Sequence, residues 1–429
     1  MIRFIYNLLW PIGLIFFLPG YLVKMFRRGN YREKFGQRLG WYEPQLQAKL
    51  YWKKSIWLHA VSVGEVTIAL KLAQQIHLLN PDLHCVLTTT TTTGFSFANK
   101  QATEWMEIMY SPLDFWPIMR RAFSVIRPKK IVLVEAELWP NLVAEASART
   151  IPIALVNARL SPRSEKRFKR FRGIVGPVFR MLDAVCVQSP EDVERWKALG
   201  VAEERIHPFG SIKFDPEEME IDRELPRSVL AGFGLERRTV IFGGSTHSGE
   251  EKLLAEVFRA LKRDFIDLLL VLAPRHTERT GEVRREIEGM GFHIALRSQV
   301  PAPDPFLDCL LIDSTGELRH WYAVATIVFI GKSLRAQGGQ NPAEAILAGK
   351  PVLFGPHMEN FAALASALVA NGGAIQVNSS TDLRRAMAHL LANPEERERM
   401  DKNAHQVLDV HRGATARTAQ FVLDLARGA

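Results

Sequence analysis

SIWLHAVSVGEVTIALKLAQQIHLLNPDLHCVLTT, residues 55–89, is the stretch that decides the fold. Ser55–Val61 is a short apolar run that predicts a buried strand, and Leu83–Thr89 predicts a second strand, rich in β-favouring residues. Between them, Glu65–Leu79 carries apolar residues at helical spacing, which predicts an amphipathic helix. Buried strands that alternate with helices are typical of a parallel sheet with helices on both faces.

The same alternation continues along the chain. Further strands are expected at Ile131–Val134, Ile153–Val156 and Ala184–Val187, with a helix over Trp139–Ala148. Phe214–Ser228 (FDPEEMEIDRELPRS) then interrupts the rhythm, because it is acidic, contains two prolines and lacks a periodic apolar face. We interpret this stretch as a linker.

Beyond the linker the alternation starts again. The expected strands are Thr239–Phe242, Leu268–Leu272, Cys309–Ile312, Ile327–Ile330 and Pro351–Phe354. The expected helices are Gly249–Lys262, Glu278–Met290, Pro342–Ala348 and a helical C-terminal segment, Asp382–Arg427. A chain of 429 residues is long enough for two domains. The sequence therefore predicts an α/β protein with two Rossmann-like, doubly wound domains whose ligands bind in a cleft between them.

The N-terminus departs from this pattern. Phe4–Val23 is almost uniformly apolar and long enough to cross one bilayer. A basic run follows (Lys24, Arg27, Arg28, Arg32, Lys34, Arg38), which places the main body on the cytoplasmic side. A cleaved signal peptide and a helix buried in a groove of the first domain are the alternatives. We expect a membrane anchor over residues 1–26, domains over 27–213 and 229–405 joined by the linker 214–228, and a C-terminal helix over 406–429.

Composition narrows the class of partner. The net charge of +9 favours an anionic partner, such as nucleic acid, a phosphate-bearing substrate or a membrane surface. Nucleic acid is the weakest of these, because the positive charge lies in local runs without interleaved aromatic residues. The three cysteines, Cys85, Cys186 and Cys309, lie far apart in apolar runs, so we expect three buried thiols and neither a zinc site nor disulfides.

Two motifs of the first domain place carboxylates where a strand ends. In HAVSVGE (59–65), Glu65 begins a helix and is a candidate general base, although from local pattern alone a glutamate that complements the helix dipole is the better reading. In EAELWPN (135–141), Glu135 and Glu137 lie two residues apart, on one side of an extended chain. One of them could stabilise positive charge on a sugar ring, or both could serve the helix that Pro140 starts. We favour a functional role for Glu135 and leave both readings open for Glu137.

Four turns of the second domain follow strands and precede helices: GGSTHSGEE (243–251), APRH (273–276), DSTGEL (313–318) and GGQNPAE (338–344). Turns of this kind bind phosphate with backbone N–H groups and the helix dipole. Arg275 could bind a phosphate or a base edge, or form a surface ion pair. Glu344 could accept two ribose hydroxyls or simply cap the helix that Asn341 and Pro342 start. Because no Asp-x-Asp pair occurs, we expect no metal, and cations such as Arg275 and Lys213 neutralise the leaving group.

Taken in order, ten motifs resemble the Kdo (3-deoxy-D-manno-octulosonic acid) transferases of lipopolysaccharide synthesis, which are GT-B glycosyltransferases. They span nearly the whole chain: HAVSVGE, TTTTTTG, VEAELWPN, NARLSPRS, GSIKFD, STHSGEE, APRH, DSTGEL, GGQNPAEA and GPHMENF. Family members often read Gly-Gly-Ser where this chain has Gly331-Lys332-Ser333, and carry a bulkier residue than Ala343.

The resemblance implies an inverting transfer of Kdo from CMP-Kdo to lipid IVA, with no cofactor, Glu65 as the base and Glu135 as the transition-state stabiliser. It implies CMP contacts on Pro274, Arg275, Gly316, Glu317, Leu318, Asn341, Pro342, Ala343 and Glu344, with Ser245 and Lys213 as additions.

The apolar segment and its basic run suit a lipid acceptor at the cytoplasmic face of a bacterial inner membrane. We expect no nucleic acid as a partner, and no obligate protein partner is evident. A basic run over residues 163–172 could meet the phosphates of the acceptor or form a solvated helix face. Two alternatives remain. One is a UDP-sugar-dependent transferase that acts on another membrane lipid, and the other is a membrane-tethered binding protein without catalysis.

Overall fold

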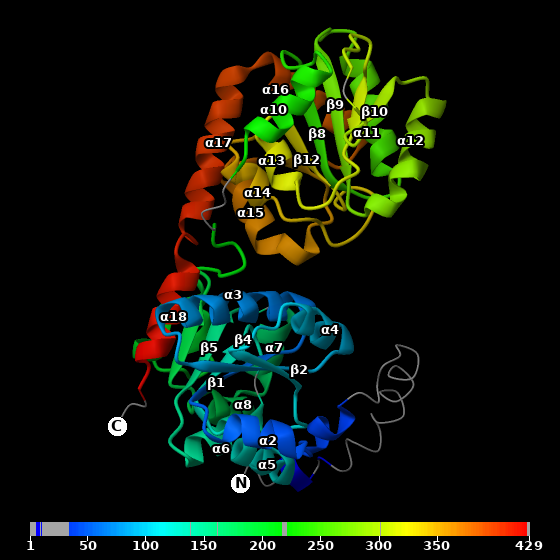
Figure 1. Ribbon diagram of the computed structural model, residues 1–429. Coiled ribbons are helices and arrows are strands. Elements are labelled where there is room, and N and C mark those ends of the chain that lie inside the picture. Colours follow the sequence, from blue (N-terminus) through cyan, green and yellow to red (C-terminus); the bar gives the residue numbers. More distant parts are fainter. Residues whose placement is uncertain are drawn as a thin grey trace. The chain divides into compact units, whose positions relative to one another are not determined.

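The computed structural model describes residues 6–8, 10, 34–137, 139–160, 162–216, 221–300 and 302–426. The chain divides into two compact units (Figure 1). Unit 1 extends to Asp215 and also contains the segment from His411 onward, and unit 2 is Pro216–Val410. The segment expected to be a linker is partly helical, because helix α10 (Glu224–Gly232) begins inside it. The apolar side chains of α10, including Val229 and Leu230, are buried, which the two prolines and the acidic residues of the stretch obscured.

Unit 1 contains a sheet of seven parallel strands in the order β3-β2-β1-β4-β5-β6-β7. Their bounds are β1 Ser55–Ala60, β2 His84–Thr89, β3 Met106–Tyr110, β4 Pro128–Val134, β5 Ile153–Ala158, β6 Ala184–Val187 and β7 Ile206–Pro208. The strand order reverses between β1 and β4. At such a switch point the loops leave in opposite directions and open a crevice at the carboxyl ends of the strands.

Helices cover both faces of this sheet. Figure 1 shows α3 (Val63–Leu79), α4 (Thr92–Lys100) and α18 (Ala414–Asp424) on one face. The other face carries α2 (Pro44–Tyr51), α5 (Trp116–Ile126), α6 (Pro140–Ala148) and α8 (Arg172–Phe179). The remaining helices are η1 Phe35–Leu39, α7 Pro162–Arg170, α9 Asp192–Lys197 and η2 Glu203–Arg205.

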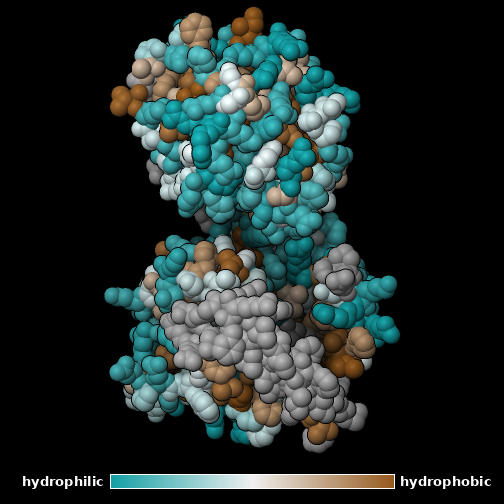
Figure 2. All heavy atoms as spheres, turned by 90° about the vertical axis from the view of Figure 1, so that its right-hand side faces the viewer, coloured by the Kyte–Doolittle hydropathy of each residue, from teal (hydrophilic) through white to brown (hydrophobic). Residues whose placement is uncertain are grey.

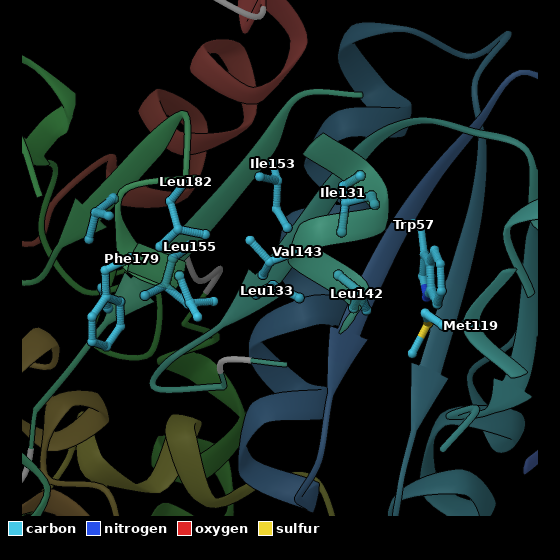
Figure 3. Close-up of a cluster of buried hydrophobic side chains, with 14 of the residues drawn as sticks. Trp57, Met119, Ile131, Leu133, Leu142, Val143, Ile153, Leu155, Phe179 and Leu182 are labelled. Atoms are coloured by element: carbon cyan, nitrogen blue, oxygen red, sulfur yellow. The ribbon is translucent and has the colours of Figure 1, made fainter. Parts of the chain in front are cut away.

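Successive side chains of β1 enter the two separate cores of unit 1, as expected for a strand that is buried on both sides. Ile56 and Leu58 pack with α3 and α18, whereas Trp57 packs on the opposite face. Figure 3 shows this second core, in which Trp57 lies beside Met119 of α5. The continuous apolar runs of the sequence therefore position the strand ends rigidly.

Unit 2 repeats the architecture with a parallel sheet in the order β10-β11-β9-β8-β12-β13-β14. Its strands are β8 Thr239–Thr246, β9 Leu268–Pro274, β10 Ile294–Leu296, β11 Cys309–Leu311, β12 Ile327–Ile330, β13 Val352–Phe354 and β14 Ala374–Gln376. Besides α10, its helices are α11 Glu250–Leu261, η3 Thr277–Arg279, α12 Thr280–Gly289, α13 Leu318–Tyr322, α14 Ala343–Leu347, η4 Glu359–Phe361, α15 Ala362–Ala370, α16 Ser380–Ala392 and α17 Pro394–Asp409. Its switch point lies between β8 and β12.

The expected membrane anchor, residues 1–26, lies largely outside the described residues. Its described part contacts unit 1: the side chain of Asn7 donates to Asn141 (2.8 Å) and accepts from the backbone N–H of Trp116 (3.2 Å). The ring of Trp10 stacks on Phe115 with centroids 5.1 Å apart. Within the described ranges, no helix combines the length and the apolar character that a membrane span requires. The three cysteines are free and buried, as predicted.

Candidate active site at the two switch points

The carboxylate of Glu65 is fixed at the carboxyl end of β1. Ser62 caps helix α3 by accepting from the backbone N–H of Glu65, and its hydroxyl donates to Glu65 Oε1 (2.7 Å). The backbone N–H of Val61 donates to Glu65 Oε2 (2.8 Å). The carboxylate of Glu65 therefore helps to satisfy the polar groups at the start of α3. The same two hydrogen bonds also orient the carboxylate, and each oxygen retains a lone pair for a substrate proton.

Glu135 occupies the other side of the same switch point. It follows β4 directly, and its backbone N–H donates to the carbonyl of Val156 (2.9 Å). The expectation of an extended chain here is wrong, because Glu135 has φ +61° and starts a turn. A left-handed backbone is costly for a residue with a Cβ, and such strain is frequent where a side chain must be aimed at a functional site.

The acidic cluster of Glu65, Glu135 and Glu137 shares one electrostatic environment. Burial, and next the charge of Glu65, raise the pKa of Glu135. The same two causes, in the same order, raise the pKa of Glu137 to about 7. Glu137 is therefore partly protonated at neutral pH, so the three carboxyl groups need not all carry charge.

Two cations accompany the acidic cluster. Lys213 follows β7, and Arg159 follows β5; both lower the pKa of Glu135, against the larger opposing effects of burial and Glu65. Burial lowers the pKa of Lys213 itself, and the charge of Glu135 opposes that change. Sequence reasoning quoted Arg159 only within a motif and gave it no role. Its position one residue beyond the end of a buried strand could have marked Arg159 as a candidate site residue.

His59 lies behind the cluster as a neutral packing residue. Its ring is buried, which lowers its pKa to about 4, and its Nδ1 hydrogen-bonds with Thr88 Oγ1 (2.9 Å). The indole of Trp139 meets the imidazole edge-on, with ring centroids 5.5 Å apart. A histidine that stays neutral across the physiological range shapes the site but does not compete with Glu65 for a proton.

The loops at the switch point of unit 2 are held by one buried acid. The carboxylate of Glu250 accepts from the backbone N–H groups of His247 (2.9 Å), Lys332 (2.7 Å), Ser333 (3.0 Å) and Leu334 (3.0 Å). It thereby ties the loop after β8 to the loop after β12. One of the amides that we expected to bind phosphate, that of His247, is therefore already used by the protein's own carboxylate.

These two loops also touch directly. Ser245 has φ +54°, and a Cβ on Gly331 would lie only 2.3 Å from the carbonyl oxygen of Ser245. Only glycine fits at position 331. Ser245 itself is buried beneath the crevice, at the end of β8.

The other predicted CMP-binding residues lie at the same edge of the sheet. Pro274 ends β9, and the backbone N–H of the exposed Arg275 donates to Thr246 (3.0 Å). Gly316 and Leu318 flank Glu317, whose carboxylate pairs with Arg297 (2.9 Å).

The last of the four turns lies in front of α14. Asn341 accepts from the backbone N–H of Ala343 (3.1 Å), which fixes the turn that leads into this helix. Pro342 and Ala343 are buried, and Glu344 lies in the first turn of α14. All four predicted turns of unit 2 thus converge on the carboxyl ends of its strands.

Comparisons with known proteins identify the family. The family model described as 3-deoxy-D-manno-octulosonic-acid transferase (kdotransferase) matches residues 33–216, and the model for glycosyl transferases group 1 matches residues 311–407. The chain is 33% identical to the 3-deoxy-D-manno-octulosonic acid transferase of Haemophilus influenzae, over 90% of either chain. It is 34% identical to the enzyme of the same name from Bordetella pertussis, over 86% of this chain and 87% of the relative.

Solved structures share the fold. UDP-GlcNAc 2-epimerase from Neisseria meningitidis aligns over 86% of this chain and 100% of its own, with 12% identity and a TM-score of 0.55. A glycotransferase of kitacinnamycin aligns over 87% of this chain and 99% of its own, with 16% identity and a TM-score of 0.53. The two parallel sheets therefore form a GT-B-like fold, and together with the identity to its relatives they show that the chain belongs to the family of 3-deoxy-D-manno-octulosonic acid (Kdo) transferases.

Proposed function

We propose that this protein transfers Kdo from CMP-Kdo to lipid IVA, with inversion at the anomeric carbon, during lipopolysaccharide synthesis. One observation carries the proposal: a carboxylate oriented by two hydrogen bonds, Glu65, shares the switch point of unit 1 with Glu135 and Glu137. Oriented carboxylates at one edge of a sheet suit proton removal next to a sugar that acquires positive charge.

The proposed reaction is a single displacement. Glu65 removes the proton from an acceptor hydroxyl while that oxygen bonds to the anomeric carbon of Kdo. The bond from this carbon to the phosphate oxygen breaks, and its electron pair leaves with CMP. Glu135 stabilises the positive charge that develops on the sugar ring, and Lys213 and Arg159 prevent the acidic cluster from repelling an anionic donor.

Unit 2 supplies the features of a nucleotide site. Arg275 is exposed, and its backbone N–H is hydrogen-bonded to Thr246 at the carboxyl end of β8. Glu344 begins a helix at the same sheet edge and suits the two ribose hydroxyls of cytidine. When a nucleoside monophosphate leaves, the charge of a single phosphate group must be neutralised, and cationic side chains can do this without a metal.

The surface of unit 1 suits a lipid acceptor. Among its exposed large apolar residues are Trp41, Trp116, Phe171 and Ile174. The helix α7, next to Phe171 in sequence, carries Arg167, Lys169 and Arg170 in its last turn. Figure 2 shows hydrophobic side chains that reach the surface among hydrophilic ones. Apolar and basic side chains together favour an anionic membrane, and we propose the cytoplasmic face of the inner membrane.

The test is transfer by the purified full chain, with CMP-Kdo and lipid IVA as substrates and product masses as the readout. Glu65→Gln should lower turnover by about 10²–10⁴-fold, as expected when a general base is lost. Glu104→Gln, which changes an exposed glutamate of the same unit, should leave turnover unchanged. Wild-type turnover in Glu65→Gln, with the fold retained, would refute the mechanism. Consumption of a UDP-sugar in place of CMP-Kdo would refute the donor.

A further inference from the structure

Lys332 stands at the switch point of unit 2, two residues beyond the end of β12. Its backbone has φ +57°, a left-handed conformation that glycine adopts freely and lysine adopts at a cost. The conformation is fixed from both sides. Its N–H donates to Glu250 (2.7 Å), and its carbonyl accepts from the N–H of Gly339 (2.9 Å). Two backbone hydrogen bonds therefore hold Lys332 in a conformation that is costly for a residue with a side chain.

The side chain of Lys332 extends over the glycine-rich loop that leads to α14. A Cβ built on Gly338 would lie 3.4 Å from both Cε and Nζ of Lys332. Gly338 and Gly339 both have positive φ, which brings the loop backbone close beneath the ammonium group. The ammonium group thus lies between the β12 switch-point loop and the loop that carries Asn341.

Two acids lie close to Lys332, and neither forms an ion pair with it. The carboxylate of Glu359 accepts from the backbone N–H of Gly338 (2.6 Å). The carboxylate of Glu250 is fully engaged by backbone N–H groups. Among the described residues of unit 2, the acids Glu251 and Glu317 pair with Arg279 and Arg297, and none forms an ion pair with Lys332.

Two histidines lie in the neighbouring turns. The rings of His247 and His276, which follow β8 and β9, meet edge-on with centroids 6.0 Å apart. The charge of Lys332 acts on His247: burial is the main cause that lowers the pKa of His247, and Lys332 and His276 lower it further. Lys332 therefore lies close enough to the turn after β8 to act on it electrostatically.

We propose that Lys332 is a donor-binding residue whose ammonium group contacts the phosphate of CMP-Kdo. The inference rests on the proposed function and names the group that binds the leaving phosphate. When the carbon–oxygen bond to Kdo breaks, the electron pair moves onto a phosphate oxygen, and the charge of CMP rises from one negative to two. Because Glu250 already occupies the loop amides, a lysine ammonium at the switch point provides the compensating charge.

The test measures binding of CMP and of cytidine to the full chain by calorimetric titration. Lys332→Ala should lower the affinity for CMP at least tenfold, which is the loss expected for one charged hydrogen bond, and should lower the affinity for cytidine less than twofold. Lys332→Arg should retain CMP binding within about threefold, since it keeps the charge. Lys332→Gly should lower the affinity for CMP as much as Lys332→Ala does. It should not lower the Tm, because glycine adopts φ +57° without strain. Lys252→Ala, an exposed lysine on α11, is the matched control and should bind CMP as wild type does.

The outcomes separate the two proposals. Equal CMP affinity in wild type and Lys332→Ala overturns the role of Lys332 and leaves the proposed donor intact. An equal loss of CMP and cytidine also overturns it, because it means that the lysine only shapes the loop. A wild-type chain that binds neither CMP nor cytidine overturns the proposed donor itself, and Lys332 with it.

Discussion

Removing the charge of Glu137 should stabilise the protein, and more strongly at alkaline than at acidic pH. Glu137 lies beside Glu65 and Glu135, and its pKa in the folded protein is about 7 instead of the ordinary 4.5. The folded state therefore holds this proton more tightly than the unfolded state does. The stability that this proton contributes is complete below pH 4.5 and is lost as the pH rises through about 7. Glu137→Gln replaces the acid with a side chain that is neutral at every pH.

The magnitude follows from the two pKa values. Each pKa unit corresponds to about 1.4 kcal/mol, so the ionised glutamate costs about 3 kcal/mol at pH 8 and about 1 kcal/mol at pH 5. Glu137→Gln should recover these amounts. For a unit of this size, 1 kcal/mol shifts the Tm by about 2–4 °C. The expected gain in Tm at pH 8 is therefore about 6–12 °C for unit 1.

The assay is thermal unfolding of the full chain at pH 5 and pH 8, in the same detergent and salt. Glu104→Gln is the control, since Glu104 is an exposed glutamate of unit 1 and its substitution should leave the Tm unchanged at both pH values. A Tm gain of equal size at pH 5 and pH 8 would refute the electrostatic reasoning, because packing does not depend on pH. A loss of stability at pH 8 would show that the charged form of Glu137 is needed for folding.

Three further substitutions test other contacts. Ser62→Ala should lower the free energy of unfolding by about 1 kcal/mol and lower kcat about tenfold or more, since the hydroxyl of Ser62 caps α3 and orients Glu65. Ser379→Ala removes the equivalent cap of α16 and is the control. An equal loss of kcat in Ser379→Ala would contradict the positioning role of Ser62. Glu250→Gln should lower the free energy of unfolding by about 2–4 kcal/mol and weaken the binding of CMP, because an amide has one acceptor oxygen for four N–H donors. An unchanged Tm together with unchanged CMP affinity would contradict this role of Glu250. Asn141→Ala should lower the free energy of unfolding by about 2–3 kcal/mol and speed proteolysis near residue 10, because this buried side chain forms hydrogen bonds with both Asn7 and Asp114. An unaltered rate of cleavage would show that other contacts hold the segment.

Sequence reasoning succeeded where burial on both faces leaves an unambiguous apolar run. The predicted strand Ala184–Val187 coincides with β6, and the predicted helix Glu65–Leu79 differs from α3 by two residues. The edge strand β3 escaped notice because Glu107 interrupts its apolar run. That glutamate is only partly buried, and it pairs with Lys49 of α2. Edge strands bury less side-chain surface, so their pattern is weaker.

At the candidate site, the sequence predicted which residues lie at strand ends. It did not predict how these residues change one another's pKa values or hydrogen bonds. The position of Glu135 after β4 was predictable, whereas its left-handed backbone was not, because nothing in a non-glycine sequence signals positive φ. The raised pKa of Glu137 depends on Glu65, which lies far away in sequence and close in the folded chain. The engagement of Glu250 by loop amides has the same origin, since three of its four partners follow a different strand.

Unit 1 is completed by α18, the last helix that the structure describes. Ala419 and Val422 of α18 belong to the same core as Leu72 and Ile76 of α3. During translation, about 330 residues separate these two helices, which at 5–20 residues per second is on the order of half a minute. For that interval the nascent chain exposes an apolar face of the helix that begins beside Glu65. Unit 2 can fold first as a contiguous piece, and a chaperone bound to α3 would have to leave before catalysis becomes possible.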